Sequence, residues 1–267
     1  MMKSFVRWST TLGLVGSSLL GFSSIGNLSA VALPDAQIVE KLQTVPVYTI
    51  TDQQGAPLVA AAKNGQNNNG SVAGVFISQQ DARNFIEQLK KENAQLAQTV
   101  RVVPVSLGEV YKLEQANQNK PQGLGFAFVP VQRQVDSALT LLRQGGQTIQ
   151  QFNGVPLFVA TAGKDEGYLT LQQGTQQVIP FFFDKEQLQG MVDRFKQQKP
   201  DMASTVKIKV VNLQGVIQAL RSSNTPQMNN IVLVPSQESL AFLQSLPAAP
   251  TSKPPSPAPA QRTTPRR

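Results

Sequence analysis

The side chains best suited to acid–base or metal chemistry in this chain are carboxylates, because the sequence contains neither histidine nor cysteine. A Ser-His-Asp or Cys-His nucleophile is therefore excluded, and a metal site would need oxygen ligands alone. Glu109 and Glu114 are five residues apart, which places them on different faces of a helix and makes them poor acid–base partners. Asp165 and Glu166 lie in a Gly-Lys-Asp-Glu-Gly stretch typical of a solvated turn. Distant segments could still bring two carboxylates together, but we predict no catalytic residue, no metal site, no cofactor and no enzyme activity.

Nucleotide and nucleic-acid binding find little support in the sequence. Gly123-Leu124-Gly125 precedes a predicted strand, whereas the glycines of a dinucleotide-binding motif follow one. The net charge of +8 comes mostly from six basic residues in two terminal segments that carry no acid. Removing those six charges leaves about +2 for the rest of the chain, without a basic stripe. We therefore predict no nucleic-acid partner.

Both termini differ in composition from the rest of the chain. Residues 1–32 read as a secretory signal peptide: Lys3 and Arg7 precede the apolar stretch Leu12–Phe22, and Ala30-Val31-Ala32 predicts cleavage after Ala32. An uncleaved amphipathic anchor is the alternative, and we expect no transmembrane segment in the mature chain. Residues 247–267 contain seven prolines and predict a disordered, polyproline-like tail. The tail is either an inert terminus or a tether to peptidoglycan, anionic lipid or a partner.

Between these ends, one pattern occurs twice at a spacing of about 106 residues, which suggests a duplicated half-domain. The paired blocks are Val45–Tyr48 with Val155–Phe158, Val75–Ser78 with Phe181–Asp184, Val100–Val102 with Val206–Ile208, and Val129–Gln132 with Val234–Gln237. We predict an N-terminal half-repeat at 33–144, a connecting loop at 145–154 and a C-terminal half-repeat at 155–246. The two halves should be related by a pseudo-twofold axis.

Each half predicts strands and helices in the order β-β-β-α-β-α-β-α. Continuous apolar runs predict strands, and apolar residues three and four apart predict helices. In the first half the expected strands are 45–51, 57–61, 72–77, 100–105 and 126–129, with helices at 79–92, at 107–113 and around 135–142. Ser78 and Asp184 are the predicted N-caps of the helices that follow them. Pro46 suits a first or edge position, because proline cannot donate to the hydrogen-bond ladder of a sheet. The fold class is therefore α+β, with mixed sheets and helices packed on them.

Apolar residues on the helices after the fourth strand of each half are the candidates for a binding surface. Most are expected to be core, but any that stay exposed would line a groove for an unfolded or extended apolar segment, once per half. The candidates are Val110, Tyr111, Leu113, Val216, Ile217 and Leu220.

Three segments closely resemble the Tic-twenty-two-like family, which includes the intermembrane-space component of the chloroplast inner-envelope translocon and its cyanobacterial relatives. They are Val45–Asp52, Val72–Ser78 and Val103–Tyr111, and the resemblance extends over about residues 40 to 246. The bacterial-type signal is similar to the cyanobacterial branch. The resemblance implies a soluble periplasmic chaperone in outer-membrane biogenesis. Its partners would be unfolded outer-membrane protein precursors and an outer-membrane β-barrel assembly protein.

In plastids the corresponding role is preprotein passage through the intermembrane space, the compartment equivalent to the periplasm. The family supplies no catalytic residues to transfer, and the proline-rich tail departs from it. Our leading hypothesis is an ATP-independent holdase for β-barrel precursors. The alternative is a structural adaptor that bridges components of the translocation machinery without binding clients. An enzymatic function would require converging carboxylates with raised pKa values.

Overall fold

The computed structural model describes residues 32–61, 70–118, 120, 123–223 and 225–245. The predicted signal peptide, apart from Ala32, and the predicted proline-rich tail lie outside the described residues. No helix in the described part of the chain has the length and apolar character needed to cross a membrane.

The first part of the chain alternates strands and helices. In chain order they are α1 (Asp35–Gln43), β1 (Pro46–Asp52), β2 (Val59–Ala61), β3 (Ser71–Phe76), α2 (Gln79–Glu92), α3 (Ala94–Thr99), β4 (Val100–Ser106), α4 (Leu107–Asn117), β5 (Leu124–Val129) and α5 (Gln132–Gln144). The predicted order of strands and main helices is confirmed, while α1 and α3 were not predicted.

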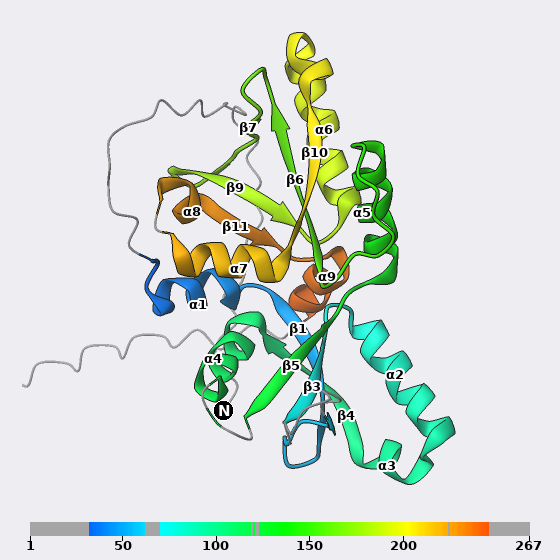
Figure 1. Ribbon diagram of the computed structural model, residues 1–267. Coiled ribbons are helices and arrows are strands. Elements are labelled where there is room, and N and C mark those ends of the chain that lie inside the picture. The colour runs from blue at the N-terminus through cyan, green and yellow to red at the C-terminus, as the bar shows by residue number, and fades with distance from the viewer. Residues whose placement is uncertain (1–31, 62–69, 119, 121–122, 224, 246–267) are drawn as a thin grey trace, which may run out of the picture.

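The second part follows a similar order after a connecting segment. Its elements are β6 (Pro156–Ala162), β7 (Gly167–Tyr168), β8 (Leu171–Gln173), β9 (Gln176–Phe182), α6 (Lys185–Gln198), the 3-10 helix η1 (Pro200–Thr205), β10 (Lys207–Asn212), α7 (Leu213–Ser222), α8 (Pro226–Asn230), β11 (Ile231–Val234) and α9 (Gln237–Ser245). The fold class α+β is confirmed, with helices packed on two separate sheets (Figure 1).

Both sheets are mixed and share one strand order. In the first sheet β4 pairs with β1, β1 with β3, and β3 in parallel with β5, while β2 also pairs with β3. In the second sheet β10 pairs with β6, β6 with β9, and β9 in parallel with β11. A pseudo-twofold relation between the halves stays a prediction. Of the two positions expected for Pro46, the structure shows the first: Pro46 is the first residue of β1, which lies between β3 and β4 and not at an edge.

A central core joins the two sheets. It contains inward-facing strand residues of both sheets, such as Val47, Val75, Leu157 and Phe181, together with apolar residues of α1, α4 and α7. These three helices lie at the level between the sheets (Figure 1). The faces of the two sheets that point toward α1, α4 and α7 therefore share one hydrophobic core.

The helices α5 and α9 each cover the sheet of the opposite half. Ala138 and Leu141 of α5 pack with Phe158 of the second sheet, and α9 lies against β1 of the first. There the ring of Phe242 meets that of Tyr48 edge-on at a centroid distance of 5.7 Å. Figure 1 shows α5 beside β10 and α9 beside β1. The exchange ties the halves together.

Local hydrogen bonds explain where several helices begin. The Ser78 hydroxyl accepts from the Asp81 backbone N–H at 3.1 Å, which confirms the predicted N-cap of α2. The Asp184 carboxylate, predicted to cap α6, makes no such bond. It accepts instead from the backbone N–H of Gln237, the first residue of α9, at 2.8 Å. Asp184 is buried beside the start of α9, so its carboxylate forms a hydrogen bond with the first residue of that helix and not with α6.

Candidate functional site

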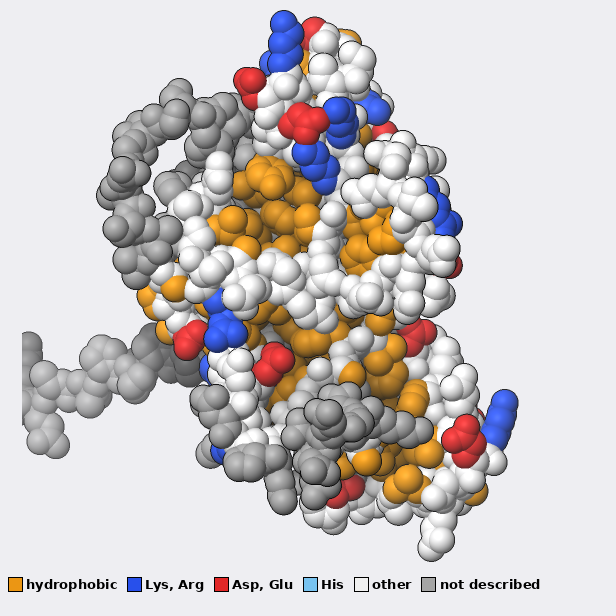
Figure 2. All heavy atoms as spheres, viewed as in Figure 1, with side chains coloured by type: hydrophobic (Ala, Val, Ile, Leu, Met, Phe, Trp, Pro, Cys, Tyr) orange, Lys and Arg blue, Asp and Glu red, His pale blue; other side chains and the backbone are white. Residues whose placement is uncertain are grey.

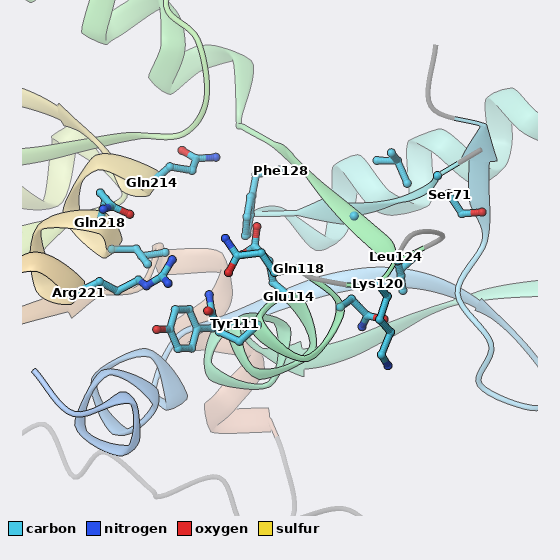
Figure 3. A pocket seen from close by; sticks show the side chains of 17 residues that line it. Ser71, Tyr111, Glu114, Gln118, Lys120, Leu124, Phe128, Gln214, Gln218 and Arg221 are labelled. Atoms are coloured by element: carbon cyan, nitrogen blue, oxygen red, sulfur yellow. The ribbon is translucent and has the colours of Figure 1, made fainter. Parts of the chain in front are cut away.

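A cleft of about 700 Å³ opens between α4 and α7, over one end of β3 and β5 (Figure 3). It brings together residues that are up to 151 positions apart in the chain. Its lining consists of Gly70, Ser71, Val72, Tyr111, Glu114, Gln115, Asn117, Gln118, Lys120, Gly123, Leu124, Gly125, Phe128, Gln214, Ile217, Gln218 and Arg221. Because α4 and α7 belong to different halves, the cleft is shared between them.

The apolar part of the lining is fixed by the core beneath it. Phe128 and Ile217 are half-buried and pack against the central core. The Tyr111 side chain is only 2% exposed, and its hydroxyl donates to Asp35 Oδ1 at 2.8 Å. Burial, followed by the bond to Asp35, raises the pKa of Tyr111 to about 12. The tyrosine is thus a neutral, immobile part of the wall that also anchors α1.

Three charged residues belong to the lining of the cleft: Glu114 on α4, Arg221 on α7, and Lys120 between α4 and β5. Burial raises the pKa of Glu114, while the positive charge of Arg221 opposes that rise. Figure 3 shows Glu114 on α4 and Arg221 on α7, on facing walls. The charges of Glu114 and Arg221 offset each other, and Lys120 leaves the lining with one net positive charge.

Amide side chains surround the apolar part. Gln118 on α4 and Gln214 and Gln218 on α7 stand along the two helices that flank the opening (Figure 3). Each primary amide offers two donors and one acceptor oxygen, which is the hydrogen-bonding complement of a peptide backbone. The spacing of Gln214, Gln218 and Arg221 on one helical face was a sequence signal for this surface that our apolar search did not use.

The six predicted site residues separate into four groups, of which Val216 forms the last. Tyr111 and Ile217 line the cleft. Leu113 is 52% exposed but stands outside it. Val110 and Leu220 are buried in the central core and line no surface, so that expectation is wrong for both. An apolar stripe on a helix packs against the core first, because burial of these residues stabilises the fold.

Val216 lines a second, smaller hollow of about 240 Å³ in the second half. Its other lining residues are mainly apolar and come from β9, β10, α7 and α8: Tyr168, Ile179, Phe181, Val211, Asn212, Gly215, Ala219, Gln227, Met228 and Ile231. Figure 2 shows hydrophobic side chains gathered both over the second sheet and over the first. The shared cleft and this smaller hollow differ in size and lining, so these two do not form the expected pair of equivalent grooves, one per half.

The carboxylates considered for chemistry have structural roles. Glu109 completes a capping box with Ser106 at the start of α4. Glu166 forms ion pairs with Lys207 and Lys209 at the surface. Across the described residues, no group of three acidic side chains is arranged to hold a metal ion. The cleft thus offers apolar contact and hydrogen bonding.

Fold and cleft together define a two-sheet α+β protein with exchanged helices and an open, weakly charged surface between its halves. The sequence profile of the Tic22-like family matches residues 16–245, and the chain belongs to this family. The structure is similar to Anabaena Tic22, described as a protein-transport protein, with a TM-score of 0.74 and 36% identity. That likeness covers 82% of this chain and all of the Anabaena chain. Tic22 from Plasmodium falciparum is also similar, with a TM-score of 0.57 and 25% identity over 78% of this chain and 96% of the other.

Two plant proteins are related in sequence. The protein TIC 22-like, chloroplastic, of Arabidopsis thaliana is 26% identical over 203 residues, which cover 74% of this chain and 60% of the plant protein. The protein TIC 22, chloroplastic, of Pisum sativum is 22% identical over 230 residues, 86% of this chain and 84% of the pea protein. The matched region therefore spans three fifths of the Arabidopsis relative and most of the pea relative.

Proposed function

We propose that this protein is a periplasmic, ATP-independent holdase in protein transport that binds unfolded outer-membrane β-barrel precursors in the cleft between α4 and α7. The observation that carries the proposal is the composition of that cleft: an apolar floor at Phe128 and Ile217, bordered by amide side chains and carrying one net positive charge. Such a surface suits extended polypeptide segments of varied sequence.

Magnitudes favour reversible capture. Burial of roughly 400 Å² of client apolar surface would contribute about 10 kcal/mol at ~25 cal/mol per Å². Ordering the client segment and losing its translational freedom offset most of that gain, which leaves micromolar affinity. A holdase of this affinity lowers the concentration of aggregation-prone client and still releases it to an assembly machine.

The proposed client class is supported by the chemistry of the cleft and by the similarity to a protein-transport protein. Strands of outer-membrane barrels alternate apolar and polar side chains with few charges on the apolar side, which matches the cleft's floor and its amide border. Anabaena Tic22 is described as a protein-transport protein, and its chain is similar throughout its length to this one. Release to an outer-membrane β-barrel assembly protein would complete the cycle.

The test replaces Ile217 by Asp and measures suppression of aggregation when an unfolded porin is diluted from urea. Ile217 is half-buried at the cleft, so a carboxylate there should weaken client capture at least about 10-fold through loss of apolar contact and desolvation of the new charge. Leu113→Asp is the matched control, because Leu113 is an exposed apolar residue outside the cleft.

Equal suppression by the two variants would contradict the assignment of the cleft. If the wild-type protein captures a β-barrel assembly protein but never delays porin aggregation, the adaptor function replaces the holdase function. Both variants should keep a cooperative urea transition, which separates loss of binding from loss of fold.

A further inference from the structure

The outer edge of β5 carries unused hydrogen-bonding groups of the backbone. In the described part of the chain, β5 pairs with β3 alone. The Val129 carbonyl accepts from the Ile77 N–H at 3.1 Å, which fixes the side of β5 that faces β3. Backbone groups of alternate residues point to opposite sides, so those of Leu124, Phe126 and Phe128 point away from β3. No described residue makes a hydrogen bond to them.

Two other edge strands carry features that hinder pairing with another chain. At the far edge of the first sheet, β4 contains Arg101 and Pro104. At the far edge of the second sheet, β10 contains Lys207 and Lys209. Charged residues and proline on edge strands oppose the addition of a further strand. The strand β5, with the sequence Leu-Gly-Phe-Ala-Phe-Val, has neither.

The strand β11 occupies the position in the second sheet that β5 occupies in the first, and its edge is partly covered. The Val234 carbonyl accepts from the Phe183 N–H, so the backbone groups of Ile231 point outward. The Ile231 carbonyl accepts from Lys41 Nζ of α1 at 3.1 Å. A lysine thus occupies one of the two outward acceptors of β11, whereas no described side chain does so for β5.

The open edge of β5 also faces the cleft. Leu124, Gly125 and Phe128 belong to its lining, and Gln214 and Gln218 of α7 stand across from Phe128 (Figure 3). A strand placed beside β5 would therefore have backbone partners on one side and primary amides on the other. Its alternate side chains would lie on the apolar floor.

We propose that a client binds by adding one strand to the first sheet: an extended, uncharged segment of another polypeptide pairs with the outer edge of β5 inside the cleft. The inference rests on the proposed function and specifies how the client is held. Binding through the backbone gives affinity without requiring a particular sequence, and the floor selects for alternate apolar side chains.

The test uses three fluorescent peptides of one sequence, about eight residues long, in which threonine alternates with leucine or valine. One peptide is unmodified, and in the other two either the odd or the even backbone amides are methylated. For a strand added in one direction, parallel or antiparallel to β5, only one set of amides can face β5 when the apolar side chains lie on the floor. Methylation of that set should weaken binding more than about 10-fold, and methylation of the other set should weaken it less than about 3-fold.

Leu124→Pro provides the corresponding change in the protein. It removes one outward N–H at the first residue of the strand, a position that tolerates proline, and should weaken binding of the unmodified peptide roughly 3- to 10-fold. Leu124→Ala is the control for the lost side chain and should bind at least about twice as well as Leu124→Pro, with both variants unfolding cooperatively.

Equal binding of the two methylated peptides, or no binding of the unmodified one, would overturn strand addition. A dimer of the protein that the peptide dissociates would also overturn it, because a second copy would then be the occupant of the edge. If the two methylated peptides bind equally while the protein still suppresses porin aggregation, the holdase function stands and only binding by strand addition is rejected. Loss of both activities would reject the proposed function itself.

Discussion

At the scale of single residues, Tyr111 shows how the wall of the cleft is held in place. Its ring is buried in the central core, and its hydroxyl donates to Asp35 of α1. Tyr111, which the sequence analysis selected as a client contact, therefore stabilises the packing of the cleft wall. Ile217, selected for the same reason, does reach the cleft. Periodicity identified the apolar faces of both helices but could not separate the packed positions from the open ones.

Removing the hydroxyl tests the anchoring role of Tyr111. Tyr111→Phe should lower the free energy of unfolding by about 1 kcal/mol, because it loses one hydrogen bond to a carboxylate on an exposed residue. Urea denaturation at neutral pH measures this value. In a double-mutant cycle with Asp35→Ala, the two losses should not add. Strict additivity would mean that the bond contributes nothing to stability.

The same residue gives the protein a stability that depends on alkaline pH. The pKa of Tyr111 in the folded protein is raised to about 12, above the value near 10 of an unfolded chain. The folded state therefore holds the Tyr111 proton more tightly, and the contribution of this residue to stability is constant below pH 10 and decreases between pH 10 and 12. Tyr111→Phe should show a smaller decrease over that interval than the wild type. An unchanged alkaline slope would contradict the assignment.

At the scale of elements, the exchanged helices are secured by side chains that cross between the halves. Gln134 of α5 is buried, donates to Glu186 Oε2 at 2.8 Å, and accepts from the backbone N–H of Lys185 at 3.1 Å. On the other side, Glu238 of α9 accepts from the backbone N–H of Gln80 at 2.9 Å. Each exchanged helix thus provides an acceptor for the first turn of a helix in the opposite half.

Substitution of Asp184 tests the hydrogen bonds that connect the two halves. The buried carboxylate of Asp184 accepts from the Gln237 backbone and from the Gln134 amide, so Asp184→Ala leaves the Gln237 N–H without this acceptor and the Gln134 amide nitrogen bonded to Glu186 alone. The free energy of unfolding should fall by about 2 to 3 kcal/mol. Asp193→Ala on the same helix is the control: Asp193 accepts from Gln189 one turn away, and its loss should cost less than about 0.5 kcal/mol. Equal losses would show that the cross-half bonds are unimportant.

The sequence predicted individual elements better than their arrangement. Helix 79–92 was predicted with the bounds that α2 has, because Ser78 marks its start and one apolar stripe runs through it. The nine-residue α1 was missed, since Ile38 and Leu42 are its only buried positions and Pro34 provides no side-chain cap. The exchange of α5 and α9 was not predictable either, because an apolar face does not specify which sheet it covers.

At the scale of the whole molecule, the central core and the exchanged helices make the two halves one folding unit. Residues 33–144 contain α5, which covers the second sheet, and lack α9, which covers Tyr48 of the first. A fragment of residues 33–144 should therefore show no cooperative thermal transition. When mixed with residues 147–245, it should regain one, monitored by near-ultraviolet circular dichroism. Cooperative unfolding of the isolated fragment would mean that the exchange contributes little to folding.

The shared cleft is also a property of the whole molecule. Neither half contains both of its walls, since α4 comes from the first and α7 from the second. Sequence spacing does not show which helices face each other, so a cleft shared by two halves could not be predicted from it. Client binding in this cleft requires that polypeptide enter the space between these two helices.

Site-specific photocrosslinking measures this directly. A photoreactive residue at Gln218, on the α7 wall, is compared with one at Gln198, exposed at the end of α6 and outside the cleft. Each protein is irradiated with an unfolded porin diluted from urea. We predict crosslinks to the porin from position 218, competed by an uncharged strand-forming peptide, and few from position 198. Equal crosslinking from both positions, without competition, would contradict the cleft as the site of client binding.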